Sequence, residues 1–177
     1  MLIIPITIIA GIILAGTSII LTSIKTGIGP LPSSGKARRV VLSAAKTAGA
    51  GPIIDLGSGW GSFVIPLARK YPDREIIGYE LSFVPYYFSL VLKGLLGLGN
   101  LTLKRQDFLR AELSGASVLL CYLFPGGMVS LEEKLLHELK GRTSVISCLF
   151  ALPSCMPSRT IRLDDVYKTP VYIYEKI

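Results

Sequence analysis

The chain has 177 residues, a mass of 19.1 kDa and a formal net charge of +7, and half of its residues are hydrophobic. This length suits one globular domain, and the composition excludes a disordered polyelectrolyte, a coiled coil and a collagen-like fibre. Three cysteines without a CxxC pair exclude a disulfide scaffold. No metal is expected either, because a single histidine cannot supply a cluster of histidine ligands.

The first 24 residues carry no charged side chain. Residues 2–21 are almost wholly apolar, and about 20 such residues span a hydrocarbon core. We therefore expect an uncleaved transmembrane anchor within residues 1–24, with the bilayer as a partner of residues 2–21. A cleaved signal peptide is the alternative, but it would have a basic start and a shorter apolar run. A buried core helix is disfavoured because the run has no polar face.

Positive charge follows this apolar run. Five cations precede the first acid, Asp55, and the rest of the chain carries only +2. Cations after a membrane span favour the cytoplasmic side or an equivalent compartment, so we expect a single-pass protein with its domain on that side. Because the excess charge flanks the span, no nucleic acid partner is expected. Residues 25–34 are predicted to be a linker rich in Gly, Pro and Ser, and residues 35–177 the globular domain.

Strands and helices alternate through that domain, which predicts a doubly wound α/β sheet with antiparallel strands at its C-terminal end. Pro66 lies within the second predicted helix and should kink it or delay its start. In the last helix, Glu132 and Glu133 are expected on a solvated face. The predicted helices cover about 33–48, 62–70, a longer stretch from 82, and 130–140. The predicted strands are 52–56, 75–79, 101–105, 117–123, 144–150, 159–163 and 170–175.

A glycine-rich turn occupies residues 55–61, Asp-Leu-Gly-Ser-Gly-Trp-Gly, between a predicted strand and a predicted helix. A dinucleotide-binding fingerprint would place its third glycine at 62, but Gly61 is followed by serine. Gly57 and Gly59 let the backbone approach a ligand closely. The carboxylate of Asp55 would repel phosphates and suits a cationic ligand.

Two further acids follow the next predicted strands. Glu80 can accept hydrogen bonds from both ribose hydroxyls of a nucleoside. Asp107 can accept the exocyclic amine of adenine, and Phe108 can pack on its ring. The carboxyl ends of parallel strands meet at one edge of such a sheet, so these side chains should form one site. The alternative is that the glycine turn is only structural and that Asp107 merely caps a turn.

At these residues the chain resembles class I S-adenosylmethionine-dependent methyltransferases. It is most similar to the small protein-lysine methyltransferases, which include membrane-anchored mitochondrial enzymes acting on the ATP synthase c-ring protein and the adenine nucleotide translocase, and archaeal and bacterial relatives. Trp60 stands where that family usually has an acid. The matching stretches are GPLPSS at 29–34, IIDLGSGWGSFVI at 53–65, IGYELS at 77–82, QDF at 106–108, LEEKLLHELKGRTSVISCLFALPSCMP at 131–157 and VYIYE at 171–175.

The resemblance implies a Rossmann-like methyltransferase fold, S-adenosylmethionine as cofactor, and a lysine of a membrane-associated protein as methyl acceptor. Tyr122 and Phe124 follow the fourth predicted strand and are candidates for the acceptor channel. Tyr122 would orient the amine or act as a weak base, and Phe124 would form a wall; simple core packing is the alternative. The cofactor-binding residues implied are Pro32, Ser33, Asp55, Gly57, Ser58, Gly59, Gly61, Glu80, Asp107 and Phe108.

Two other functions remain open at this point. The acceptor could be a lipid, a quinone or another small amphiphile at the membrane, or the domain could be a non-enzymatic, membrane-attached binding module. Residues 121–126, Cys-Tyr-Leu-Phe-Pro-Gly, lack the (D/N)PP(Y/F) signature of enzymes that methylate the amino groups of DNA bases. Methylation of adenine or cytosine amines is therefore disfavoured.

Overall fold

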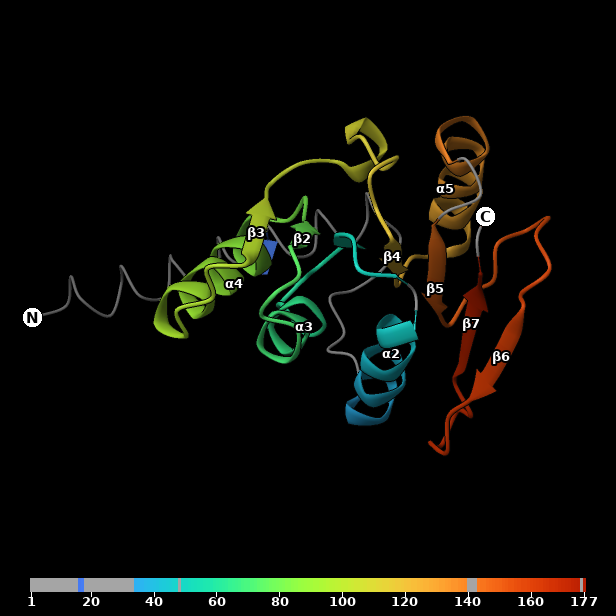
Figure 1. The fold of residues 1–177 in the computed structure, drawn as a ribbon, viewed down its shortest axis with the longest axis horizontal. Helices are drawn as coiled ribbons and strands as arrows, with labels where there is room; N and C mark the ends of the chain where they lie inside the picture. The colour runs from blue at the N-terminus through green and yellow to red at the C-terminus, as the bar shows by residue number, and fades with distance from the viewer. Residues whose placement is uncertain (1–15, 18–33, 48, 140–142, 176) are drawn as a thin grey trace, which may run out of the picture.

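A seven-stranded sheet with the order β3-β2-β1-β4-β5-β7-β6 forms the centre of the molecule (Figure 1). The computed structural model describes residues 16–17, 34–47, 49–139, 143–175 and 177. Strands β1 to β5 are parallel, and β7 is antiparallel to both β5 and β6. The predicted α/β sheet with C-terminal antiparallel strands is confirmed. The strands are β1 Ile53–Leu56, β2 Ile76–Tyr79, β3 Leu101–Lys104, β4 Val118–Cys121, β5 Ser144–Cys148, β6 Arg159–Arg162 and β7 Pro170–Tyr174.

Helices cover both faces of the sheet. In Figure 1, α2 and α3 lie below it and α5 lies above it, while α4 packs beside β3 at one end. Alternation along the strands fills two cores: Ile53 packs on the side of α2 and α3, and Ile54 on the side of α5. The helices are α2 Gly35–Thr47, α3 Val64–Lys70, α4 Phe83–Leu95 and α5 Pro125–Glu138, with a 3₁₀ turn, η1, at Phe108–Arg110.

Two helix starts show how local chemistry sets the boundaries. α2 begins after Ser34, whose Oγ accepts the N–H of Ala37 at 3.1 Å, as expected of a cap. α3 begins only at Val64, so Pro66 lies in its first turn, where the missing N–H costs no helical hydrogen bond. The predicted late start is therefore confirmed.

The start of α5 was not anticipated correctly by the sequence pattern, which predicts a helix from residue 130. The helix begins at Pro125, because proline fits the first helical position. Gly126 and Gly127 then follow under the ring of Phe124, where a Cβ would come within 2.6 Å and 3.2 Å of ring carbons. Close packing of that ring explains two glycines in a helix. The helix ends at Glu138, and Gly141, its predicted stop, lies outside the described residues.

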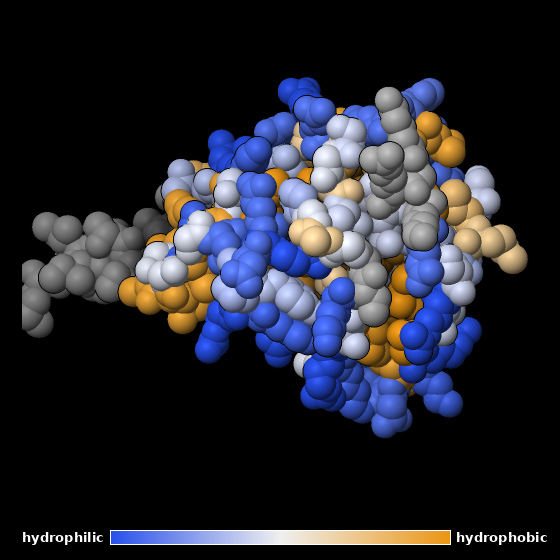
Figure 2. Space-filling model, viewed as in Figure 1, coloured by the Kyte–Doolittle hydropathy of each residue, from blue (hydrophilic) through white to orange (hydrophobic). Residues whose placement is uncertain are grey.

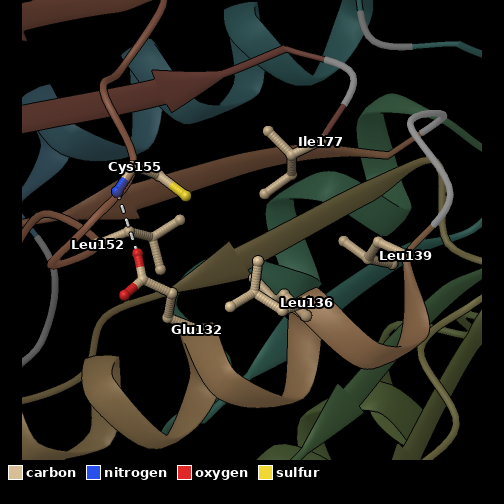
Figure 3. A pocket seen from close by; sticks show the side chains of 7 residues that line it. Glu132, Leu136, Leu139, Leu152, Cys155 and Ile177 are labelled. Atoms are coloured by element: carbon tan, nitrogen blue, oxygen red, sulfur yellow. Dashed lines mark hydrogen bonds between the residues drawn. The ribbon is translucent and has the colours of Figure 1, made fainter.

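Glu132 is buried, so the prediction of a solvated side chain is wrong; Glu133 is exposed as predicted. The carboxylate of Glu132 accepts the N–H groups of Ser154 and Cys155 at 2.8 Å and 3.1 Å (Figure 3). The loop after β5 passes over α5 here, and its amides need an acceptor when they leave water. Beside this contact lies an apolar cavity of about 130 Å³, which none of the acids proposed for the cofactor lines.

The predicted anchor and linker fall almost entirely outside the described residues, which include only residues 16, 17 and 34 of that stretch. Within the described part of the chain, no helix combines the length and apolar character that crossing a bilayer requires. The anchor therefore stays a prediction from the sequence.

Candidate functional site

The proposed site residues meet at the carboxyl edge of the parallel strands. Leu56, the last residue of β1, pairs with Tyr79 on one side and Cys121 on the other, and Tyr79 pairs with Lys104. β1, β2, β3 and β4 therefore end in line, and the segments that follow them share one rim. The sheet order reverses direction between β1 and β4, which is where open α/β sheets bind ligands.

The glycine turn needs its glycines for conformational reasons. Gly57, Gly59 and Gly61 have φ values of +117°, +51° and +80°, a region that residues with a Cβ rarely adopt. At Gly61 a Cβ would also lie 2.6 Å from Cδ1 of Ile65. The N–H groups of Gly57 and Ser58 both donate to the carbonyl of Tyr79, at 3.0 Å and 2.8 Å. The turn is thus folded back against the end of β2.

Glu80 links the glycine turn to α4. Its Oε2 accepts the N–H of Gly59 at 2.8 Å, and its Oε1 accepts the N–H of Ser82 at 2.6 Å. The residue is 9% exposed, so the carboxylate is largely withdrawn from water. Each carboxylate oxygen can accept more than one hydrogen bond, which leaves capacity for two neighbouring hydroxyl groups of a ligand.

Asp55 is the most unusual group of the edge. Its side chain is buried, and Oδ2 has no hydrogen-bond partner among the described residues; the same holds for the buried Oγ of Ser58. Burial, and secondarily the charge of Glu80, raises the pKa of Asp55 to about 8. Buried polar atoms almost always have partners, so these two atoms point to a group that the chain itself does not supply.

A family match decides what that group is. The model of the ANTKMT methyltransferase domain matches residues 55–159, which is more than half of the chain and includes all of this edge. The chain belongs to this family. It is an S-adenosylmethionine-dependent methyltransferase.

Individual relatives agree with the family match. The chain is 27% identical over 146 residues to a protein-lysine N-methyltransferase of Saccharolobus islandicus, which covers 81% of this chain and 91% of that protein. It is 31% identical over 111 residues to a lysine N-methyltransferase of Mus musculus that is named for ATP synthase, which covers 62% of this chain but 44% of the mouse protein. The chain thus spans under half of the mouse enzyme.

Solved structures carry the same fold. An RNA methyltransferase from Salinibacter ruber, in complex with S-adenosyl-L-homocysteine, superposes with a TM-score of 0.74 at 25% identity. The match covers 82% of this chain and 94% of that one.

The residues of the edge fit S-adenosylmethionine, the cofactor of the methyltransferase. When bound, this cofactor supplies a methyl group made electrophilic by a sulfonium. Asp55 can place a negative charge beside the cationic part of the cofactor, and the free Oγ of Ser58 can pair with one of its polar atoms. Glu80 can accept the ribose hydroxyls while it holds the glycine turn. The individual roles stay predictions.

Asp107 and Phe108 have structural contacts in addition to their predicted roles. Oδ1 of Asp107 accepts the N–H of Leu109 at 3.0 Å and so caps η1, as the alternative interpretation anticipates. Phe108 packs against the core on the α5 side. Both residues follow β3 on the cofactor edge, and their contact with adenine remains a prediction.

Tyr122 and Phe124 flank the start of α5 on the same edge. Tyr122 is partly buried against the core on the α2 and α3 side, and burial raises the pKa of its hydroxyl. A raised pKa keeps the proton on the phenol, which favours an orienting hydroxyl over a base. Phe124 precedes the helix and stacks over its two glycines. Pro32 and Ser33, the other predicted cofactor residues, lie outside the described residues.

We expect Tyr122→Phe to lower turnover roughly tenfold or more and to change S-adenosylmethionine affinity little. The substitution removes only the hydroxyl, so packing against the core is retained. Single-turnover methyl transfer and calorimetric cofactor binding would measure the two effects. Unchanged turnover would reduce Tyr122 to a packing residue.

The sequence analysis missed Ser89. This residue is fully buried in α4, and its Oγ donates to the carbonyl of Gly59 at 2.9 Å. It therefore holds the glycine turn from the side opposite to Glu80. The signal was present, because Ser89 is the only hydroxyl-bearing aliphatic side chain in the apolar stretch 83–95.

Proposed function

We propose that this methyltransferase transfers the methyl group to a lysine amine of a membrane-associated protein. The observation that carries the proposal is the similarity to the archaeal protein-lysine N-methyltransferase, which extends over nine-tenths of that protein's length. The mammalian relatives are also named as lysine methyltransferases.

The chemistry of the edge suits an amine. A lysine must lose its proton before it can attack, and removal from water lowers its pKa from about 10.4. A separate strong base is then unnecessary, which agrees with Tyr122 keeping its proton. Holding the amine in line with the methyl group is the main task of the site, and positioning of this kind is worth about 7–11 kcal/mol.

The membrane part of the proposal rests on the sequence. Residues 2–21 are apolar and uncharged, and cations follow them. An anchor there would confine the enzyme to the bilayer surface and raise its effective concentration toward membrane proteins. The domain would then lie on the cytoplasmic side or in an equivalent compartment.

Two other acceptors compete with a lysine. A lipid, a quinone or a similar amphiphile would also benefit from an enzyme held at the membrane. An RNA acceptor is favoured by the RNA methyltransferase of Salinibacter ruber, which matches most of the chain. A non-enzymatic binding module, the remaining alternative, does not agree with the family match.

One labelling experiment separates the three acceptors. The full-length enzyme is incubated with tritiated S-adenosylmethionine and host membranes, and the label is followed through protease digestion, RNase digestion and organic extraction. We expect protease-sensitive label that acid hydrolysis releases as methyl-lysine. The Asp55→Asn variant is the control, because it should bind cofactor poorly.

The fractions have opposite meanings for the proposal. Label that RNase releases, or that moves into the organic phase, would contradict lysine transfer while leaving the methyltransferase activity intact. Loss of all label would contradict the proposed acceptor class as a whole, provided that the same preparation binds S-adenosylmethionine.

A further inference from the structure

Helix α4 exposes an apolar face that no other described element covers. Phe83, Tyr87, Val91 and Leu95 follow one another at four-residue steps and lie on one side of the helix. They are between 45% and 77% exposed, whereas only Pro85 and Ser89 are buried in this helix. Figure 2 shows the apolar residues gathered at the end of the molecule where Figure 1 places α4. Contiguous apolar patches of this kind mark interaction sites.

The surroundings of this face carry only positive charge. No acid occurs between Glu80 and Asp107, while Lys93, Lys104 and Arg105 fall in that stretch. The guanidinium carbon of Arg105 lies 5.7 Å from the centre of the Phe83 ring, so a cation directly borders the apolar surface. Aromatic, aliphatic and basic side chains on one helix are the composition of elements that lie in a membrane interface.

We propose that this α4 face docks onto the surface of an anionic lipid bilayer. Lipid acyl chains would take up the four apolar side chains, and anionic headgroups would pair with the flanking cations. A second copy of the chain fits less well, because a symmetric contact would bring identical cations together without an acid. The apolar residues 2–21 of the chain itself would offer those cations no charge.

Docking through α4 would orient the cofactor edge toward the membrane. The rings of Trp60 in the glycine turn and Phe88 in α4 meet edge to face at 5.2 Å. Ser89 and Glu80 also tie the helix to the turn. The inference goes beyond the proposed function, because it holds for any acceptor near a bilayer and needs no lysine transfer.

The protein carries its own probe for this contact. Trp60 is the only tryptophan of the chain, and it lies against the α4 face. The full-length protein is reconstituted into vesicles of equal parts phosphatidylcholine and phosphatidylglycerol, with the phosphatidylcholine brominated on its acyl chains. We expect quenching of the Trp60 fluorescence, and weaker quenching when phosphatidylglycerol is omitted.

A matched pair of variants tests whether α4 is responsible. Leu95→Glu places an acid on the proposed face, and Leu136→Glu does the same on α5, where the residue is 74% exposed. A roughly tenfold weaker docking equilibrium would change a population about nine-tenths docked to about half docked. We therefore expect Leu95→Glu to lose about half of the quenching and Leu136→Glu to lose none.

Equal quenching in both variants would overturn the proposal, as would its absence in the unaltered protein. The second result would mean that residues 2–21 or another copy cover the face. S-adenosylmethionine affinity, measured in each variant, verifies the fold. Tyr87→Ser, which removes apolar surface without adding charge, should reproduce the loss if Leu95→Glu fails this check.

Discussion

Asp55→Ala should weaken S-adenosylmethionine binding by on the order of 100-fold or more, because removing one partner of a buried charge pair costs about 3–5 kcal/mol. The carboxylate is buried, and its Oδ2 has no partner among the described residues. A cationic cofactor would supply that partner. Isothermal titration with S-adenosylmethionine measures the loss.

The fold should survive this substitution. In the free protein the pKa of Asp55 is raised to about 8 by burial, so the group is mostly neutral at pH 7. A carboxyl whose folded pKa lies above its unfolded value contributes stability that is fully present below about pH 4 and is lost as the pH rises through about 8. Asp55→Asn, which stays neutral, should remove this decline between pH 5 and 9 in urea unfolding.

Cofactor affinity should show the opposite trend. The ionised form of Asp55 is the one that attracts a cation, so affinity should rise by up to about tenfold per pH unit below pH 8 and then level off. Asp55→Asn controls for titration of the cofactor itself and should give the remaining slope. Equal affinity of the variant and the unaltered protein would show that the site is misplaced.

Most of the fold follows from short-range sequence patterns. The apolar runs before Asp55, Glu80 and Asp107 define three parallel strands, and the glycines between the first strand and its helix define the turn. These features depend on neighbouring residues, which is why they can be predicted. The start of α5 depends instead on the ring of Phe124 lying over Gly126, a contact that a glycine pair in the sequence does not reveal.

Burial of polar residues was harder to predict. Glu132 has the helix periodicity of a solvated residue, yet the loop after β5 crosses it and donates two N–H groups. Ser89 likewise gains its role from the glycine turn, thirty residues earlier in the chain. For α4 the apolar sequence predicts a helix, but only the sheet order shows that it covers the outer strand β3 and leaves one face exposed. Each of these results depends on contacts distant in sequence.

Glu80→Ala should abolish measurable cofactor binding and also lower stability. The alanine removes the acceptor for the ribose hydroxyls and leaves the N–H groups of Gly59 and Ser82 without their present partner. An unpaired buried amide costs about 1–3 kcal/mol, so the free energy of unfolding should fall by about that much. The structure thereby revises the sequence-based hypothesis that this variant, like Asp55→Ala, loses only its cofactor. Urea unfolding of the two variants side by side measures the difference.

Glu80→Gln separates the two roles of the side chain. Its amide oxygen can still accept one backbone N–H, so stability should fall less than in Glu80→Ala, while the charge that attracts both hydroxyls is gone. The unaltered protein should bind S-adenosylhomocysteine more tightly than its 2′-deoxy analogue, and Glu80→Gln should bind the two with nearly equal affinity. A variant that keeps the full preference for the 2′-hydroxyl would assign the ribose to another residue and leave Glu80 as the anchor of the glycine turn alone.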